Sequence, residues 1–254
     1  MSFSSMVKNE LCRIDMNKSC CMVSELAAVI RTGGNITVSE ESVCVRIVTE
    51  NAAFARRGFS IVRRVYSVSP QVVTRKRKKL KKHITYILLI NLPLADGRIL
   101  KSIGITAEPG PEGMRTRYEP DTEVLLRDSC CKKAYLRGAF LAGGSISDPE
   151  KTYHLEITNH HYSLALQLNR LMEDYGLKPR IIKRKGSHVS YLKEGENIVD
   201  FLNIIGAHSA LMELENIRIL KDMRNNVNRI VNCETANLEK TVNASVRQVE
   251  NIKY

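Results

Sequence analysis

Apolar and polar positions alternate along the chain in an order that occurs twice. Residues 25–34 have the apolar spacing of a helix that ends at two glycines, and residues 36–48 alternate like two strands joined by a turn. Asn51 is a candidate cap for a helix with one apolar side, and a second hairpin is predicted across residues 72–90. A short helix across residues 97–104 closes this first unit.

The same order returns about 110 residues later. Residues 134–144 again predict a helix that ends in paired glycines, and a hairpin follows around the turn at residues 148–150. A helix across residues 159–176, capped by its first residue, leads to a hairpin with a glycine turn at residues 180–192 and to a helix at residues 196–206. Two copies of five elements in one order predict an α+β fold built from two repeats related by a pseudo-twofold axis.

These units define the domain boundaries that we expect. The first repeat spans residues 1–105 and the second spans residues 129–208, each with a four-stranded sheet covered by helices on one face. Residues 106–128, rich in Pro, Gly and charge, are predicted as a linker. Residues 209–254 predict a helical linker, a break at residues 232–235, and a further amphipathic helix that begins an incomplete helical domain.

Composition narrows the class of protein. The 254 residues are 43% hydrophobic and 26% charged, which is typical of a folded chain with a buried core. No stretch predicts a membrane helix, and the N-terminus lacks a signal-peptide layout, so we expect a cytoplasmic protein. Seven cysteines without a Cys-x-x-Cys spacing predict reduced thiols, mostly small buried hydrophobic side chains, with no metal and no cofactor.

The positive charge is concentrated in one segment. The formal net charge is +12, and residues 51–104 contain 13 basic residues and one acidic residue, so the rest of the chain is neutral. The densest run, residues 75–82, favours a polyanion as partner, and nucleic acid above a membrane surface, because its flanks alternate like strands. A solvated hairpin tip or a lysine-protected edge strand is the alternative interpretation.

Small residues recur on the helix that opens each repeat. Aligning the two glycine pairs matches Ala28 with Gly138 and Thr32 with Ala142. Small side chains at i and i+4 on both helices would let the two backbones approach closely at the centre of the molecule. The alternative is that small residues fit any crowded core.

The two opening helices resemble a known motif. Residues 136–144 resemble the defining helix of the LAGLIDADG homing endonuclease fold, and residues 26–34 resemble a degenerate partner. The resemblance implies that the paired helices form the repeat interface and that the two sheets form a saddle over the DNA major groove. In active relatives an acid precedes the final glycine, where this chain has Gly33 and Gly143.

Cleavage of a phosphodiester in that fold needs a divalent metal held between carboxylates. With glycine at both acid positions, we expect no catalytic residues, no metal and no enzymatic activity. Asp148 and Glu150 lie nearby, but the Pro149 between them indicates a turn. Gly33 and Gly143 also have a structural interpretation, as left-handed residues that end a helix.

Several longer segments resemble the bacterial WhiA family: residues 134–145, 191–196, 221–225 and 231–237. This resemblance implies a DNA-binding transcription regulator involved in sporulation, cell division and chromosome segregation. It also implies association with the nucleoid, with another transcription regulator as a candidate partner. WhiA relatives carry a C-terminal helix-turn-helix domain, of which we expect only the opening helix here, so the resemblance implies a C-terminally truncated protein.

If the saddle binds DNA, alternate residues of the second hairpin in each repeat should face it. The dense run in the first repeat predicts phosphate contacts, which supply affinity without reading sequence. The second repeat has a sparser basic pattern. The candidate DNA-binding residues are Arg75, Lys76, Arg77, Lys78, Lys79, Lys81, Lys82, Arg180, Lys183, Arg184, Lys185, His188 and Lys193.

The sequence thus predicts a non-catalytic protein whose partner is double-stranded DNA. Two alternatives stay open. One is a protein-interaction scaffold built on a degenerate saddle, which competition by plain duplex DNA would distinguish. The other is a residual metal-dependent endonuclease, which plasmid cleavage with magnesium would reveal.

Overall fold

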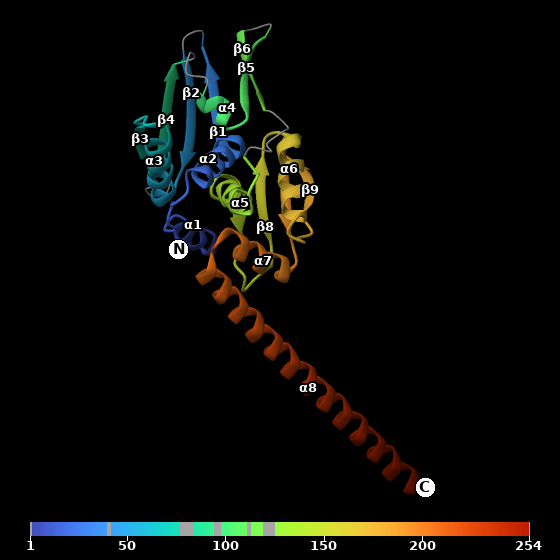
Figure 1. Cartoon of the computed structure of the whole chain (residues 1–254). Coiled ribbons are helices and arrows are strands. Elements are labelled where there is room, and N and C mark those ends of the chain that lie inside the picture. The colour runs from blue at the N-terminus through green and yellow to red at the C-terminus, as the bar shows by residue number, and fades with distance from the viewer. Residues whose placement is uncertain are drawn as a thin grey trace. The chain divides into compact units, whose positions relative to one another are not determined.

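The computed structural model describes residues 2–39, 42–76, 84–93, 98–110, 113–118 and 125–253. The chain divides into two compact units, Met1–Leu211 and Met212–Tyr254. The first unit contains both predicted repeats, and the second continues helix α8 (His208–Ile252) (Figure 1). No helix in these described ranges is both long and apolar enough to cross a lipid bilayer.

The first repeat forms a four-stranded antiparallel sheet in the order β1-β2-β4-β3. Buried Val43, Val45 and Ile47 alternate with more exposed residues along β2, so one face of the sheet lies against the helices. Its elements are α1 (Phe3–Leu11), α2 (Ser19–Gly33), β1 (Gly34–Val38), β2 (Ser42–Thr49), α3 (Ala52–Tyr66), β3 (Gln71–Lys76), β4 (Ile84–Pro93) and α4 (Arg98–Ser102).

The second repeat has the equivalent sheet order, β7-β8-β10-β9, which confirms the predicted α+β architecture of two related repeats. Its strands are shorter, and β9 and β10 meet at a tight turn where Lys185 and Gly186 both have positive φ. The elements are α5 (Ser129–Gly143), β7 (Gly144–Ile146), β8 (Leu155–Asn159), α6 (Tyr162–Glu173), β9 (Arg180–Arg184), β10 (Ser187–Leu192) and α7 (Gly195–Ile205).

The segment predicted as a linker contains a hairpin. Strands β5 (Ile105–Gly110) and β6 (Gly113–Tyr118) pair antiparallel, and β6 lies against β1 (Figure 1). Gly110 pairs with Gly113 at the end of this ladder, so part of the Pro- and Gly-rich segment belongs to paired strands.

Local patterns also missed helix α1. Its Val7 and Leu11 are fully buried, and its Lys8 Nζ lies 5.8 Å from the ring centroid of Phe140 on α5. Burial lowers the pKa of Lys8 to about 8. A nine-residue helix is too short to show a clear apolar period, and it is stabilised mainly by this docking.

Two predicted helix caps have opposite outcomes. The Asn51 side chain accepts a hydrogen bond from the Phe54 amide at 2.9 Å and caps α3, as predicted. The prediction for Asn159 is wrong, because this residue is the buried last residue of β8 and α6 begins only at Tyr162. An Asn between a strand and a helix fits either element locally, and strand pairing with His188 decided the outcome.

The predicted break at residues 232–235 is also wrong, because α8 continues through it. The Thr235 hydroxyl donates to the Val231 carbonyl at 2.8 Å, so it bonds back to the preceding turn and does not cap a new helix. A β-branched hydroxyl residue is compatible with both roles, and the sequence pattern alone does not separate them.

Helices α2 and α5 pack side by side at the centre of the first unit (Figure 1). Gly138 lies so close to α2 that a Cβ atom there would overlap the carbonyl oxygen of Glu25 and meet the Cβ of Ala28 at 3.0 Å. Near the other end, a Cβ on Gly33 would lie 3.3 Å from that of Ala142. The two backbones therefore touch along the helix pair because small residues face one another.

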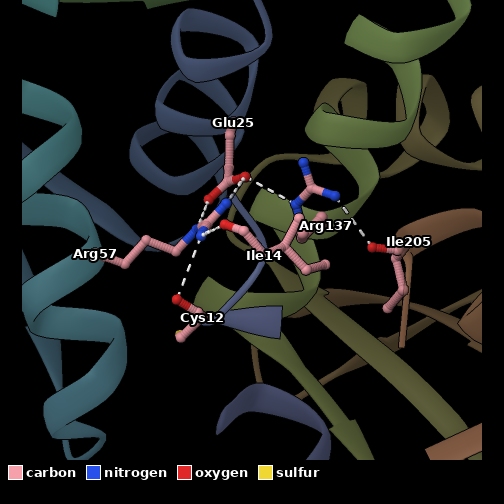
Figure 2. Close-up of polar contacts among 6 residues, drawn as sticks. All are labelled: Cys12, Ile14, Glu25, Arg57, Arg137 and Ile205. Carbon is pink, nitrogen blue, oxygen red and sulfur yellow. Dashed lines mark hydrogen bonds and ion pairs between the residues drawn. The ribbon is translucent and has the colours of Figure 1, made fainter. Parts of the chain in front are cut away.

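A buried ion-pair network spans this interface (Figure 2). The Glu25 carboxylate on α2 accepts hydrogen bonds from Arg57 on α3, with one oxygen 2.9 Å from Nη2, and from Nε of Arg137 on α5 at 2.8 Å. The Glu25 and Arg57 side chains are only 3% and 2% exposed. Although burial opposes its charge, hydrogen bonding to Glu25 raises the pKa of Arg57.

Each arginine of the network also donates to a main-chain carbonyl. Arg57 Nη1 donates to the Ile14 oxygen at 2.7 Å, and Arg137 Nη1 donates to the Ile205 oxygen at the end of α7 at 3.2 Å (Figure 2). In the first repeat, Arg31 of α2 similarly donates to the Gly104 oxygen at 2.8 Å, just after α4. Each central helix therefore supplies an arginine that satisfies carbonyls where its repeat ends.

We predict that Gly138→Ala lowers the free energy of unfolding by about 1–3 kcal/mol, because the added Cβ pushes α2 and α5 apart. This loss should appear although alanine is the better helix former. Urea unfolding followed by circular dichroism measures it.

The matched control is Gly58→Ala in helix α3, where the added Cβ would meet only the flexible end of Leu88 at 3.3 Å. It should be neutral or gain up to about 1 kcal/mol from helix propensity. Equal losses in the two variants would contradict the proposed role of the close approach.

We predict that Glu25→Gln destabilises the fold by about 3–5 kcal/mol, because it leaves the buried Arg57 and the half-buried Arg137 without a counter-charge. Asp174→Asn is the control, since it breaks the exposed Lys132–Asp174 pair, whose atoms lie 2.8 Å apart. That change should cost no more than about 1 kcal/mol. Comparable midpoints of urea unfolding for the two variants would refute the prediction.

Candidate nucleic-acid interface

Each sheet has one face covered by helices and one face without them. In the first repeat, Gly58 of α3 lies against Leu88 of β4. In the second, the Ser190 hydroxyl of β10 donates to the Ala165 carbonyl of α6 at 3.4 Å. Since side chains alternate along a strand, the residues on either side of Leu88 and Ser190 point to the opposite face, which we call the uncovered face.

Two arginines lie on the uncovered face of the first sheet. Arg46 of β2 pairs with Asn35 of β1 and with Leu89 of β4, and Arg75 of β3 pairs with Thr85. Arg46, Arg75 and Asn35 are all exposed. The sequence prediction named Arg75 and did not include Arg46, although the alternation of Arg46 with buried Val45 and Ile47 was a readable signal.

The predicted basic run lies almost wholly outside the described residues. This applies to Arg77, Lys78, Lys79, Lys81 and Lys82. Arg75 and Lys76 are the last described residues of β3, and Lys76 pairs with Ile84, which places it on the helix side of the sheet.

The predicted DNA-binding residues of the second repeat lie on both faces of its sheet. Arg180 pairs with Tyr191, and Arg184 lies at the other end of β9, so both arginines are on the uncovered face. Lys183 pairs with His188 on the opposite face, where the His188 ring lies 5.3 Å from that of Tyr162 on α6. These two residues were expected to face the same surface as the arginines, and the strand register turns them away.

The other two candidates lie at the ends of the hairpin. Lys185 occupies the turn with a φ of 49°, and Lys193 follows β10 with its Nζ 5.3 Å from the centroid of the Tyr191 ring. An aromatic ring between basic groups is a surface suited to stacking and phosphate contacts.

One acidic residue lies among these groups. Glu156 of β8 accepts a hydrogen bond from the Ser145 hydroxyl at 3.3 Å, lies 3.3 Å from His154 Nε2, and approaches Arg184 Nη1 to 4.0 Å. Arg184 is therefore partly neutralised, whereas Arg180 forms no ion pair with any of the described residues. Sequence reasoning did not single out Glu156, because an exposed acid in a strand carries no distinctive signal.

The predicted acid positions lie at the C-terminal ends of α2 and α5. Gly33 and Gly143 are followed directly by β1 and β7, so both uncovered faces begin at the paired helix ends. The expectation of left-handed glycines is wrong, since Gly34 and Gly144 have φ values of −80° and −83° and Gly33 and Gly143 are helical. Close packing explains glycine instead, because a Cβ on Gly143 would lie 2.6 Å from the Thr158 oxygen.

The cysteines depart from expectation. Of the seven, only Cys131 is buried, so the prediction of mostly buried hydrophobic thiols is wrong. Cys20, Cys21, Cys130 and Cys131 lie together, with all sulfur atoms within 4.8 Å of one another. The signal for this cluster was Ser-Cys-Cys at residues 19–21 and again at 129–131, at the repeat offset.

Burial and hydrogen bonding change the pKa values of the thiols in this cluster. Burial raises the pKa of Cys131 to about 11 and also raises the pKa of Cys21, whereas a hydrogen bond from Cys21 lowers the pKa of Cys130. Cys21 and Cys130 also line a cavity of about 430 Å³ that reaches the Glu25 network.

Two repeats joined through paired helices that lead directly into the sheets define a LAGLIDADG-type protein, here with glycine at both acid positions. Comparison with known proteins specifies the family. The profile of the WhiA N-terminal LAGLIDADG-like domain matches residues 19–106, that of the WhiA LAGLIDADG-like domain matches residues 132–224, and that of the WhiA C-terminal HTH domain matches residues 227–254. The chain belongs to the WhiA family.

Individual proteins and structures of the WhiA family also match this chain. A protein named "Probable cell division protein WhiA" from Ruminiclostridium cellulolyticum is 58% identical over 254 residues, which are 100% of this chain and 79% of the relative. The crystal structure of full-length DUF199/WhiA from Thermatoga maritima superposes with a TM-score of 0.71 at 24% identity, over 98% of this chain and 78% of that one.

A more distant structure shares the fold. The homing endonuclease I-WcaI, solved bound to its DNA recognition sequence, has a TM-score of 0.52 at 14% identity, over 78% of this chain and 92% of that one. At this identity the likeness concerns the arrangement of helices and sheets alone.

We predict that restoring an acid is tolerated at one helix end and not at the other. Gly143→Asp should lower the free energy of unfolding by about 1–3 kcal/mol, because its Cβ has no room beside the Thr158 oxygen. Gly33→Asp should cost less, because Gly33 is exposed and its added Cβ would meet only Ala142 at 3.3 Å. Both place a carboxylate at a helix C-terminus, so the dipole penalty is matched. Equal urea midpoints would contradict this.

Proposed function

We propose that this chain is a non-catalytic protein that binds double-stranded DNA and regulates transcription. The observation that carries the proposal is the position of Arg46, Arg75, Arg180 and Arg184 on the uncovered faces of two equivalent sheets. I-WcaI, a protein of related fold solved bound to its DNA recognition sequence, supports DNA as the partner of such a fold.

The charge distribution supports the same partner. The basic run at residues 75–82 lies between β3 and β4 in the sequence and holds most of the excess positive charge. Lysines and arginines in such a run contact phosphates and release counterions, which gives affinity independent of sequence. Alternation along β9 adds Arg180 and Arg184 as further phosphate contacts on the second sheet.

The side chains at the helix ends support binding without cleavage. With Gly33 and Gly143 at the paired ends, neither repeat offers a carboxylate there to hold a divalent ion. The acids that follow Gly143 most closely in the sequence form a turn, since Asp148 accepts a hydrogen bond from the Glu150 amide at 3.1 Å and lies 3.8 Å from Lys151. Magnesium-dependent cleavage of a plasmid by the purified chain would overturn this part of the proposal.

Family membership supports the cellular setting. The relatives are named probable cell division proteins, and the family includes a helix-turn-helix domain, a type of domain that reads DNA sequence. We propose that the chain acts in the cytoplasm, at the nucleoid. There it would control genes for cell division, sporulation and chromosome segregation, with another transcription regulator as a protein partner.

We predict that the double variant Arg180→Gln/Arg184→Gln flattens the slope of log K against log salt concentration by up to about 1.8, because each lost phosphate contact removes about 0.9. Replacing the basic residues of the run at 75–82 with serine should flatten it further. Fluorescence anisotropy with a labelled duplex, titrated at several salt concentrations, measures both effects.

The matched control is Lys183→Gln/Arg170→Gln, which removes the same charge from the α6 side of the second sheet. Its slope should stay close to that of the unmodified chain. If the control and the arginine variant weaken binding equally, the uncovered face is not the interface. If no variant changes the slope, the sheets do not bind DNA.

A further inference from the structure

The cysteine cluster is a feature that DNA binding does not use. Cys20 and Cys21 lie in the first turn of α2, and Cys130 and Cys131 lie in the first turn of α5. Their four sulfur atoms lie within 4.8 Å of one another, and all four are free thiols. The pseudo-twofold axis that pairs the helices therefore brings two Ser-Cys-Cys sequences, far apart in the chain, to one point.

Packing alone does not account for these residues. A thiol that serves only as a small apolar side chain is expected to be buried, as Cys131 is. Cys20 is exposed and Cys21 and Cys130 are half-buried, so three of the four thiols are accessible to solvent. The feature common to the four cysteines is that their sulfur atoms lie close together.

That arrangement fits one tetrahedral metal ion. Zinc binds four cysteine thiolates at about 2.3 Å, which places the sulfur atoms of a regular tetrahedron about 3.8 Å apart. Sulfur atoms within 4.8 Å reach this geometry through small side-chain rotations. A polynuclear iron–sulfur cluster, in which the thiolates bind separate iron atoms, needs a wider spacing than a shared single ion does.

The helix ends stabilise the thiolates that a metal requires, against the burial that raises the pKa of Cys21 and Cys131. Both cysteine pairs lie at helix N-termini, where the helix dipole stabilises negative charge. Neither Lys18 before α2 nor Asp128 before α5 makes a side-chain cap hydrogen bond, so the sulfur atoms face helix ends that lack side-chain caps. The cavity of about 430 Å³ lined by Cys21 and Cys130 gives an ion a path from solvent.

We propose that Cys20, Cys21, Cys130 and Cys131 bind one zinc ion, with two ligands from each repeat. All four ligands come from the protein, so the site is closed and structural. It joins the N-terminal ends of α2 and α5, about 20 Å along the helices from Gly33 and Gly143. Together with the Glu25 network, it fixes the relative position of the two repeats and hence of the two sheets.

The first test uses the unmodified chain. Protein purified under reducing conditions is stripped with a chelator and titrated with cobalt(II) without oxygen. We expect one cobalt ion per chain, with the intense visible bands of a tetrahedral site and sulfur-to-cobalt charge transfer corresponding to four thiolates, and stoichiometric displacement by zinc. Absence of binding, or the weak spectrum of octahedral cobalt, overturns the proposal.

The second test uses matched variants. Cys21→Ser and Cys131→Ser should each lose about a quarter of the charge-transfer intensity and bind zinc more weakly than the unmodified chain. Cys44→Ser and Cys233→Ser, which change cysteines outside the cluster, should match the unmodified chain. Unchanged zinc affinity in the first pair overturns the proposal, and if those variants do not fold, the cobalt spectrum of the unmodified chain still counts the ligands.

A third measurement distinguishes cysteines that bind zinc from cysteines that are oxidised to disulfides. Cells are lysed in the presence of an alkylating reagent, and the cluster peptides are examined by mass spectrometry. Recovery of the four cysteines as disulfides overturns the zinc proposal. Metal analysis of protein purified without chelator should find close to one zinc per chain. A defect in DNA binding has no bearing on these readouts, so the two proposals can fail independently.

Discussion

The contact between α2 and α5 is the constraint on which the rest of the first unit depends. Gly138 lies against the carbonyl oxygen of Glu25, and the carboxylate of the same Glu25 binds Arg57 and Arg137. One residue thus sets both the spacing of the helix backbones and the charge balance of the interface. A buried carboxylate is tolerated there because two guanidinium groups donate to it, while main-chain carbonyls accept further hydrogen bonds from the same guanidinium groups.

The helix pair has two ends with different chemistry. At the C-terminal ends, glycines lead directly into β1 and β7 and start the two uncovered faces. At the N-terminal ends, the same axis gathers the four cysteines. In a pseudo-symmetric protein, identical residues at equivalent positions near the axis become neighbours, so pairs that look unremarkable in each repeat form a site together.

Failures of local interpretation have a common cause. Asn159 could have capped a helix, Thr235 could have started one, and residues 106–128 had the composition of a linker. Short polar side chains form hydrogen bonds in strands, caps and helix interiors alike. Strand pairing decided the role of Asn159, and the continuation of α8 decided that of Thr235. For residues 106–128, the pairing of β5 with β6 decided the structure.

The sequence by itself determined the two repeats and their order of elements, because apolar periodicity and turn residues act over a few neighbouring positions. It also located the excess positive charge. Only the tertiary structure decided which residues meet: the Glu25 network, the cysteine cluster, and the strand register that turns Arg180 outward and Lys183 toward α6. Such contacts join positions up to about 110 residues apart, and local periodicity carries no information about them.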